Sequence, residues 1–280
     1  MAYAVRVSDD RRINLKDIDP DFHADIERED AEALADRLGA ELAELADLLF
    51  YAGTHSLLVV LQGRDTAGKD GTIRRILRHV SVQSCRVVPF KVPVGPELEH
   101  DFLWRVHMQT PGRGSIALFN RSHYEDVLVV RVRNLAPEDV WRPRYDLINA
   151  FEELLLHSNT ILVKFFLHIS KDEQKQRLLE REKEPEKAWK LNVADWEDRK
   201  FWDAYAVAYE EVFRRCSPQR APWYIVSANK KWFRDIAVLE TLVQTLKPYR
   251  DDWERSLKAL GEQRRRELEA FRKGQNPEDA

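Results

Sequence analysis

Cysteine is almost absent from this sequence, which has only Cys85 and Cys216 among its 280 residues. Because the two lie far apart and form no CxxC pair, we expect neither a disulfide framework nor a zinc site. The apolar runs are too short to span a bilayer, and the N-terminus lacks the basic-then-apolar layout of a secretory signal. These absences predict a soluble, cytoplasmic protein that does not bind a membrane.

Neither sign of charge dominates the composition. The chain has 45 Lys and Arg residues against 48 Asp and Glu, a net charge of −3, whereas nucleic-acid-binding proteins generally carry a basic surface. Nucleic acid is therefore not an expected partner. Hydrophobic residues make up 44% of the chain, enough for the core of a folded enzyme. Positive charge is local: residues 64–91 hold seven Lys and Arg against two Asp, a balance that attracts polyanions.

A glycine loop follows the apolar strand expected at residues 57–61, and it has the Gly-x4-Gly-Lys spacing of a P-loop. In such a loop the backbone N–H groups point at phosphate oxygens, the lysine adds positive charge, and the next helix N-terminus adds a favourable dipole. We therefore expect this loop to bind phosphate. Its residues are Gly63, Arg64, Asp65, Thr66, Ala67, Gly68, Lys69, Asp70, Gly71 and Thr72.

The loop departs from the usual pattern in its acidic residues. Asp70 follows the lysine where most P-loops have a Ser or Thr that ligates Mg2+, and Asp65 adds a second carboxylate. A hard cation such as Mg2+ prefers one or two carboxylates completed by water and substrate phosphates. Two interpretations stay open here: the two acids hold a metal ion, or they cap the helix that begins near Gly71.

Strand and helix patterns alternate along the chain. This alternation predicts an α/β protein with a parallel sheet covered by helices on both faces. We expect strands at 57–61, 86–90, 115–119, 160–167 and 223–226. We expect helices at 34–49, 72–80, 97–109, 145–157, 171–184, 195–216 and 232–246, and an exposed charged helix from 251 onward.

A second group of polar residues follows the strand expected at 115–119. In open α/β sheets ligands bind at the carboxyl ends of the strands, so this segment should face the P-loop. Arg121, Arg131 and Arg133 are expected to clamp phosphates. Glu125 and Asp126 either hold a metal ion or fix those arginines, and surface salt bridges are the alternative for all five residues. The histidine of this segment receives no catalytic role, because phosphoryl transfer depends mostly on positioning and charge stabilisation.

Cations recur at helical spacing in a third segment. A predicted capping box at 170–173 opens a helix on which Arg177 and Arg181, four residues apart, share one face, and Lys187 and Lys190 follow. In phosphate kinases a mobile lid brings such cations over the transferring phosphates and excludes water. A solvated helix of mixed charge is the alternative.

Taken together, the three segments closely resemble the polyphosphate kinase 2 family, over about residues 15–246. The matching motifs lie at 63–73, 119–126 and 189–191, with Ala221-Pro222-Trp223-Tyr224 near the end. The resemblance implies a P-loop kinase-like fold with three α/β/α layers, a mostly parallel sheet and a helical lid. It also implies reversible, Mg2+-dependent transfer of phosphoryl groups between inorganic polyphosphate and nucleoside phosphates, with Mn2+ as a substitute metal.

The resemblance also assigns residues to roles. By motif, Asp65 and Lys69 are the P-loop acid and lysine, Arg121 is the arginine of the second motif, and Arg177 and Arg181 are the lid arginines. These five are the expected catalytic residues, with Asp65 positioning Mg2+. Since neither substrate requires a protein nucleophile, we expect direct in-line displacement.

Asn120 narrows the resemblance to one class of the family. Many members have Asp at this place, and the Asn-Arg-Ser-His-Tyr-Glu-Asp version is similar to class III, whose members phosphorylate both AMP and ADP. We therefore expect AMP and ADP as acceptors and ADP and ATP as products, with other purine nucleotides as further candidates. With a neutral amide at Asn120, the carboxylate role at this end of the site moves to Glu125 or Asp126, the other expected metal ligands.

A linear polyanion requires a groove lined by cations. The candidates are Arg74, Arg75, Arg78, Arg121, Arg131, Lys187 and Lys190. The domain prediction is a single P-loop kinase-like domain over 1–280. Within it we expect an N-terminal helical extension at 1–53, a lid module at about 171–200 and a charged C-terminal helix at 250–280.

A homo-oligomer, either dimer or tetramer, is the expected assembly. An ATP-dependent nucleoside or nucleotide kinase is the alternative activity, and it would not need the basic groove. A non-catalytic NTP-binding regulatory module is the second alternative, against which the lid arginines and Asp65 argue.

Overall fold

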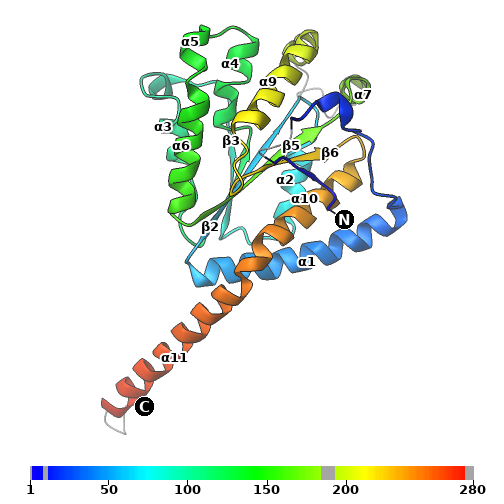
Figure 1. Ribbon diagram of the computed structural model, residues 1–280. Coiled ribbons are helices and arrows are strands. Elements are labelled where there is room, and N and C mark those ends of the chain that lie inside the picture. Colours follow the sequence, from blue (N-terminus) through cyan, green and yellow to red (C-terminus); the bar gives the residue numbers. More distant parts are fainter. Residues whose placement is uncertain (1, 9–11, 184–192, 275–280) are drawn as a thin grey trace.

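A computed structural model describes residues 2–8, 12–183 and 193–274 of the chain. The described strands form one sheet in the order β1-β6-β5-β2-β4-β3, parallel throughout except for the short β1 (Figure 1). They are β1 (Val5–Arg6), β2 (Ser56–Gly63), β3 (Cys85–Pro89), β4 (Ile116–Asn120), β5 (Thr160–His168) and β6 (Trp223–Ser227).

Helices cover both faces of the sheet. The longer ones are α1 (Arg28–Ala52), α2 (Lys69–Leu77), α6 (Arg144–His157), α7 (Lys171–Lys183), α9 (Trp202–Arg215), α10 (Lys231–Leu246) and α11 (Arg250–Gly274). The shorter ones are α3 (Trp104–His107), α4 (Val129–Val132), α5 (Glu138–Trp141) and α8 (Val193–Asp198). Within the described residues no helix combines the length and the apolar character that crossing a membrane requires.

Side-chain alternation along β2 explains the three layers. Leu57, Val59 and Leu61 pack into one core with α1, α2 and α10. Leu58 and Val60 point the other way and pack with α6 and α9. A strand buried on both faces needs apolar residues at every position, which is why β2 appears in the sequence as a continuous hydrophobic run. The predicted α/β/α fold with a mostly parallel sheet is confirmed.

Two predicted helices are broken in the structure. The helix expected at 97–109 is replaced by a 3-10 turn at Gly95–Leu98 and the short α3. Carboxylates accept hydrogen bonds from backbone N–H groups there. Glu97 accepts from the Val94 N–H at 3.1 Å, and Asp101 accepts from the Leu103 N–H at 2.9 Å. Such local bonds compete with helical ones. The helix expected at 195–216 is divided into α8, a 3-10 turn and α9.

Strand β1 was not predicted from the sequence. It consists of Val5 and Arg6, which pair antiparallel with Ile225 and Tyr224 at the edge of the sheet. Two residues carry too little periodicity to indicate a strand, and the pairing depends on a partner more than two hundred positions away.

A buried ion pair lies beneath the residues that follow β4. Lys164 Nζ in β5 lies 2.5 Å from a carboxylate oxygen of Glu152 in α6, and it also donates to the Cys216 carbonyl at 2.8 Å. The Tyr124 hydroxyl donates to Glu152 at 2.7 Å, and His123 Nε2 lies 3.2 Å from it. Burial alone would raise the pKa of Glu152, but Lys164 and His123 lower it below its ordinary value.

We expect the substitution Glu152→Ala to lower the free energy of unfolding by about 3–5 kcal/mol, because it leaves Lys164 charged and unpaired in the core. Denaturant titration measures the change. The control is Glu153→Ala on the same helix, whose contacts to His157 and Arg220 are solvent-exposed and should contribute less than about 1 kcal/mol. Equal losses in the two variants would contradict a structural role for the buried pair.

Candidate active site

The P-loop occupies the carboxyl end of β2, where the chain turns into α2. Gly68 has a φ of 104°, a left-handed value that favours glycine, and a Cβ there would lie 2.0 Å from Arg234 Nη1. Thr66 also has a positive φ, 66°, although it is not glycine. Non-glycine residues in this region cluster at functional sites, because surrounding contacts must hold the strained backbone in place.

Lys69 points back over the loop. Its Nζ donates to the carbonyls of Gly63 at 2.8 Å and Arg64 at 3.1 Å, and the side chain is buried. Burial, followed by the nearby charge of Arg121, lowers the pKa of Lys69 to about 8. The ammonium group is thus held in the cradle by weak acceptors, which phosphate oxygens can replace.

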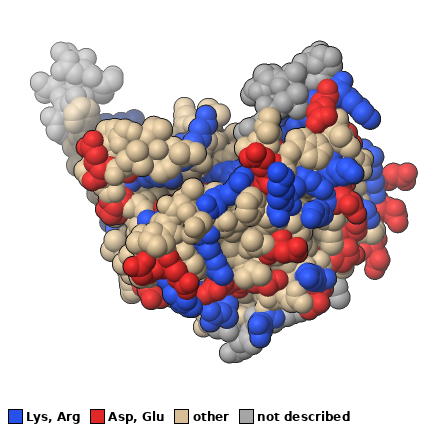
Figure 2. Space-filling view, turned by 90° about the horizontal axis from the view of Figure 1, so that it is seen from above, with Lys and Arg blue, Asp and Glu red and all other residues tan. Residues whose placement is uncertain are grey.

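A cavity of about 390 Å³ opens at the mouth of this loop. Figure 2 views the molecule from the corresponding end and shows Lys and Arg side chains gathered around the hollowed face. Its lining comes from the P-loop, α2, the end of β4, α7, α8 and α10. The lining residues are Asp65, Thr66, Gly68, Lys69, Asp70, Gly71, Arg74, Asn120, Arg121, Arg181, Asp195, Lys231 and Arg234.

The second motif faces the P-loop, as predicted from the order of the strands. Asn120 Nδ2 donates to Asp70 at 2.7 Å, so these two residues tie β4 to α2. Arg121 forms ion pairs with both Asp65 and Glu125, the latter at 3.5 Å. Glu125 raises the pKa of Arg121, burial opposes this effect and Asp65 adds to it. The arginine therefore stays charged beside the phosphate cradle.

Two of the three predicted metal ligands lie where they could hold a divalent cation. Asp65 and Glu125 line one small pocket with Arg121, and two carboxylates completed by water and phosphate oxygens suit a hard cation. Asp126 does not join them, because its carboxylate pairs with Arg144 at 2.9 Å and lines neither cavity. No cluster of three or more His, Cys, Asp or Glu residues occurs in the described ranges. The described contacts of Asp126 therefore do not support its assignment as a ligand, which stays a prediction.

Arg131 and Arg133 do not reach the cavity. Arg131 pairs with Glu211 on α9 at 3.3 Å, and Arg133 pairs with Asp198 at the end of α8 at 2.7 Å. The two arginines lie in and just after α4, so Arg131 connects α4 to α9, on which α4 packs, and Arg133 connects the end of α4 to α8. These pairings favour the salt-bridge alternative and do not support the predicted role of the two arginines as phosphate clamps, which stays a prediction.

Arg177, the first predicted lid arginine, is hydrogen-bonded to the backbone of the P-loop. Its guanidinium donates to the carbonyls of Thr66 at 2.9 Å and of Ala228 and Asn229 at 2.8 Å each. Its Nε donates to Glu173 at 2.6 Å, and only 6% of the side chain is exposed. The described contacts occupy this arginine with backbone carbonyls, so they do not support its predicted contact with phosphate.

Arg181, the second lid arginine, does line the cavity. It pairs with Asp195 at 3.3 Å and remains partly exposed.

The capping box expected at 170–173 is only half formed. Ser170 Oγ accepts from the Glu173 N–H at 3.1 Å, whereas the Ser170 N–H donates to Asn229. The Glu173 carboxylate is therefore available to bind Arg177 one turn later.

Sequence reasoning missed the cations at the start of α10. Lys231 and Arg234 line the cavity, and they follow β6 as the second motif follows β4. The rule that ligands bind at the carboxyl ends of strands could have indicated them. It could not have indicated a small aromatic pocket beside Asp65, where the Arg64 guanidinium lies 3.7 Å from the Trp202 ring centroid.

The other predicted groove residues have different outcomes. Arg74 lines the cavity, but Arg75 pairs with Asp36 at 3.1 Å, and Arg78 is not among the lining residues. Lys187 and Lys190 lie outside the described residues.

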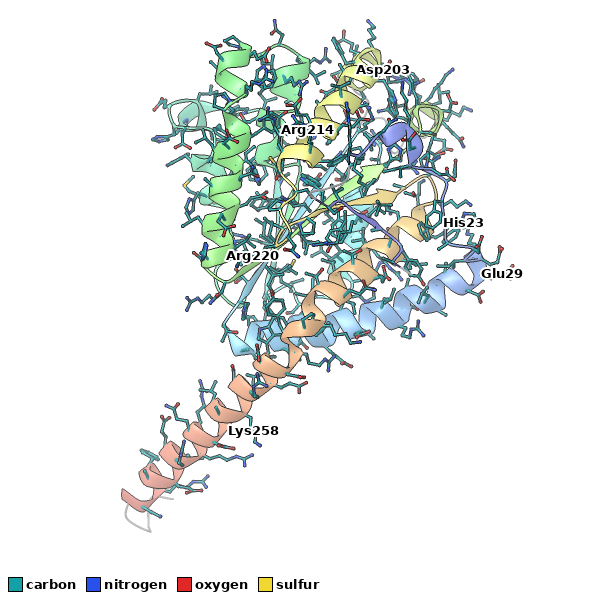
Figure 3. The ribbon with its side chains drawn as sticks, viewed as in Figure 1. His23, Glu29, Asp203, Arg214, Arg220 and Lys258 are labelled. Atoms are coloured by element: carbon teal, nitrogen blue, oxygen red, sulfur yellow. The ribbon has the colours of Figure 1, made fainter. Side chains whose placement is uncertain are left out.

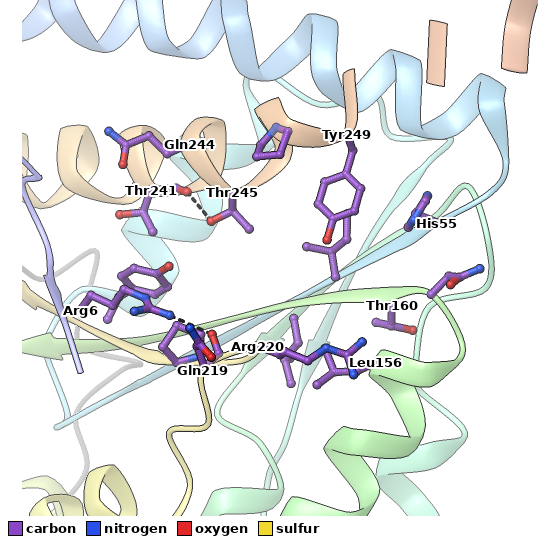
Figure 4. A pocket seen from close by; sticks show the side chains of 16 residues that line it. Arg6, His55, Leu156, Thr160, Gln219, Arg220, Thr241, Gln244, Thr245 and Tyr249 are labelled. Atoms are coloured by element: carbon purple, nitrogen blue, oxygen red, sulfur yellow. Dashed lines mark hydrogen bonds between the residues drawn. The ribbon is translucent and has the colours of Figure 1, made fainter. Parts of the chain in front are cut away.

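A second cavity of about 600 Å³ lies at the opposite end of β5 and β6 (Figure 4). Arg6, Arg220 and Tyr249 are among its lining residues, and Arg6 donates to the Gln219 carbonyl at 2.8 Å. The P-loop contributes nothing to this lining. The cavity at the P-loop is therefore the candidate active site.

The family model described as Polyphosphate kinase 2 (PPK2) matches residues 25–253. This chain belongs to the polyphosphate kinase 2 family. An AMP/ADP-polyphosphate phosphotransferase of Meiothermus ruber is 51% identical over 244 residues, which cover 86% of this chain and 91% of that protein. An ADP-polyphosphate phosphotransferase of Rhodopseudomonas palustris is 43% identical over 73% of this chain and 75% of that protein.

The fold agrees with that of solved family members. The crystal structure of a polyphosphate kinase 2 from Arthrobacter aurescens TC1 matches with a TM-score of 0.84 and 40% identity, over 87% of each chain. The resemblance identified from three motifs is thus confirmed by a match that spans most of the chain.

The two lid arginines should differ in their effect on stability. We expect Arg177→Ala to lower the free energy of unfolding by more than about 2 kcal/mol, since a hydrogen bond to a charged group contributes about 1.5–3 kcal/mol. Arg181→Ala, which removes a partly exposed ion pair, should cost less than about 1 kcal/mol. Thermal and urea unfolding of both variants test this. Equal losses would show that Arg177 does not hold the P-loop in place.

Proposed function

We propose that this enzyme transfers phosphoryl groups from inorganic polyphosphate to AMP and ADP, giving ADP and ATP, in a reversible reaction that requires Mg2+. The observation that carries this proposal is the cavity in which Lys69, Arg121, Arg181, Lys231 and Arg234 converge around one phosphate loop. The sequence observation that supports the same proposal is the similarity to the Meiothermus ruber protein, whose name includes both AMP and ADP.

The arrangement suits a donor that carries charge on every phosphate. Lys69 and the P-loop amides can bind one phosphate group, while Arg74, Lys231 and Arg234 extend the positive lining beyond it. A nucleoside kinase that uses ATP as donor has less need for such an extension. The extended positive lining of the cavity therefore favours polyphosphate as donor over the ATP-dependent alternative. The convergence of Lys69 and Arg181 favours catalysis over a regulatory binding module.

The protein contributes position and charge to the transfer. Arg121 and Arg181 lie where they can stabilise the equatorial oxygens of the transferring phosphoryl group, with the acceptor phosphate attacking in line. Asp65 and Glu125 would hold Mg2+, with Mn2+ as a substitute, and the bound ion would neutralise phosphate charge. Lys69, Arg121 and Arg181 each have a partner within the protein, so incoming phosphate oxygens compete, for example, with the Gly63 carbonyl for Lys69.

We also propose that the protein is a homo-oligomer in the cytoplasm, with no nucleic-acid partner. We also retain the division of 1–280 into an N-terminal extension, a lid module at about 171–200 and a C-terminal helix.

If Asp65 holds the metal, Asp65→Asn should lower turnover and raise the Mg2+ concentration needed for half-maximal rate, because a neutral amide is a poorer ligand for a hard cation. Magnesium titrations of the initial rate measure both quantities. Asp126→Asn is the matched control, since Asp126 faces Arg144 and its loss should leave the half-saturation point unchanged. The helix-cap interpretation of Asp65 would instead leave that point unchanged in both variants.

A time course that starts from AMP tests the activity and its acceptor range. With polyphosphate and Mg2+, ADP should appear first and ATP afterwards. Lys69→Ala should slow both steps by about 10²–10³-fold, the usual cost of one lost transition-state charge contact. This variant also excludes a contaminating kinase.

Other outcomes of the time course select other functions. Conversion of ADP without conversion of AMP would leave an ADP-specific polyphosphate kinase. Transfer from ATP but not from polyphosphate would replace the proposal by a conventional kinase.

A further inference from the structure

Helix α11 leaves the body of the protein at the end opposite the P-loop (Figure 1). Its first turn is anchored: Trp253 is fully buried, its Nε1 lies 3.1 Å from His55 Nδ1, and Arg250 pairs with Glu44 of α1 at 3.0 Å. Beyond that turn the helix extends into solvent, with side chains such as Lys258 spread around it (Figure 3). At 1.5 Å per residue the projecting part is about 25–30 Å long.

One face of the projecting helix is apolar. Leu257, Leu260, Leu268 and Phe271 recur at helical spacing and continue the face of the buried Trp253. Leu260 is 38% exposed, Leu268 48% and Phe271 61%. The stripe therefore begins in the core and runs out into solvent. An apolar stripe on a projecting helix generally marks an interaction surface.

Arg264 interrupts this stripe at its middle, and Glu267 lies on its flank three residues later. No ion-pair partner of Arg264 occurs in the described part of the chain. A charge within an apolar surface is costly to bury unless a counter-charge meets it. The partner of this stripe must therefore present an acid opposite Arg264, flanked by apolar side chains.

We propose that the partner is α11 of a second copy of this chain, paired antiparallel about a two-fold axis. With the axis between residues 265 and 266, Arg264 faces the partner's Glu267 and Leu260 faces the partner's Phe271. A parallel pair in register would instead place the two Arg264 side chains together. One polar position in an apolar seam commonly selects orientation and register in this way.

The geometry permits this pairing. The axis lies about 20–25 Å along the helix from Arg250, so the two bodies sit at opposite ends of the helix pair. A two-fold contact of this kind is self-complementary and closes at the dimer. Since α11 projects from the end opposite the P-loop, the cavity of each subunit stays accessible. The proposal specifies a surface for the homo-oligomer but does not depend on the transfer reaction.

Charge reversal tests the register. Sedimentation velocity over a wide concentration range should show a dimer for the parent protein. Arg264→Glu and Glu267→Arg should each weaken dimerisation at least about tenfold, because each places like charges opposite one another twice per dimer. The double variant R264E/E267R should restore the parent's dissociation constant. Circular dichroism and phosphoryl-transfer rates, measured in parallel, should be the same for all variants.

Matched controls carry the same charge changes on the far side of the helix. Arg266→Glu and Glu269→Arg lie two residues, or about 200°, from Arg264 and Glu267, so neither should change the dimer. The proposal is overturned by a parent protein that stays monomeric. It is also overturned by a dimer that either reversal leaves intact, by a double variant that does not recover, or by control reversals with equal effect.

Discussion

The concentration of cations at one end of the sheet is the constraint on which the site depends. Lys and Arg side chains repel one another, and burying them is costly unless each has a counter-charge or carbonyl acceptor nearby. Lys69 donates to two backbone carbonyls, Arg121 lies between Asp65 and Glu125, and Arg181 pairs with Asp195. These acceptors hold the cations in place while leaving them exchangeable for phosphate oxygens.

Not every cation near the site is exchangeable. Arg177 is buried against three backbone carbonyls, one of which belongs to the strained Thr66 of the P-loop. Below the second motif, the buried pair of Lys164 and Glu152 is joined by Tyr124. These contacts hold in place the segments that carry Arg121 and Glu125. Catalysis that depends on the position of charged groups requires such rigidity.

The P-loop and the start of α11 lie at opposite ends of the molecule. Parallel strands bring their carboxyl ends to one edge, where loops and helix N-termini can surround a phosphate chain. The other end carries the start of α11 and its anchoring aromatic residues. The proposed association through α11 and the cavity at the P-loop therefore lie on separate surfaces, so this association would leave the cavity of each subunit accessible.

Local features could be predicted from the sequence: the apolar runs of the central strands, the Gly-x4-Gly-Lys loop and the family. These depend on neighbouring residues, so strands β2 to β6 were predictable, whereas the two-residue β1 was not. The sequence did not indicate which basic side chain pairs with which acidic side chain. Arg131, Arg177 and Arg181 look alike in sequence, yet one pairs with Glu211, one binds carbonyls and one lines the cavity. These partners could not be predicted, because packing selects each of them from residues distant along the chain.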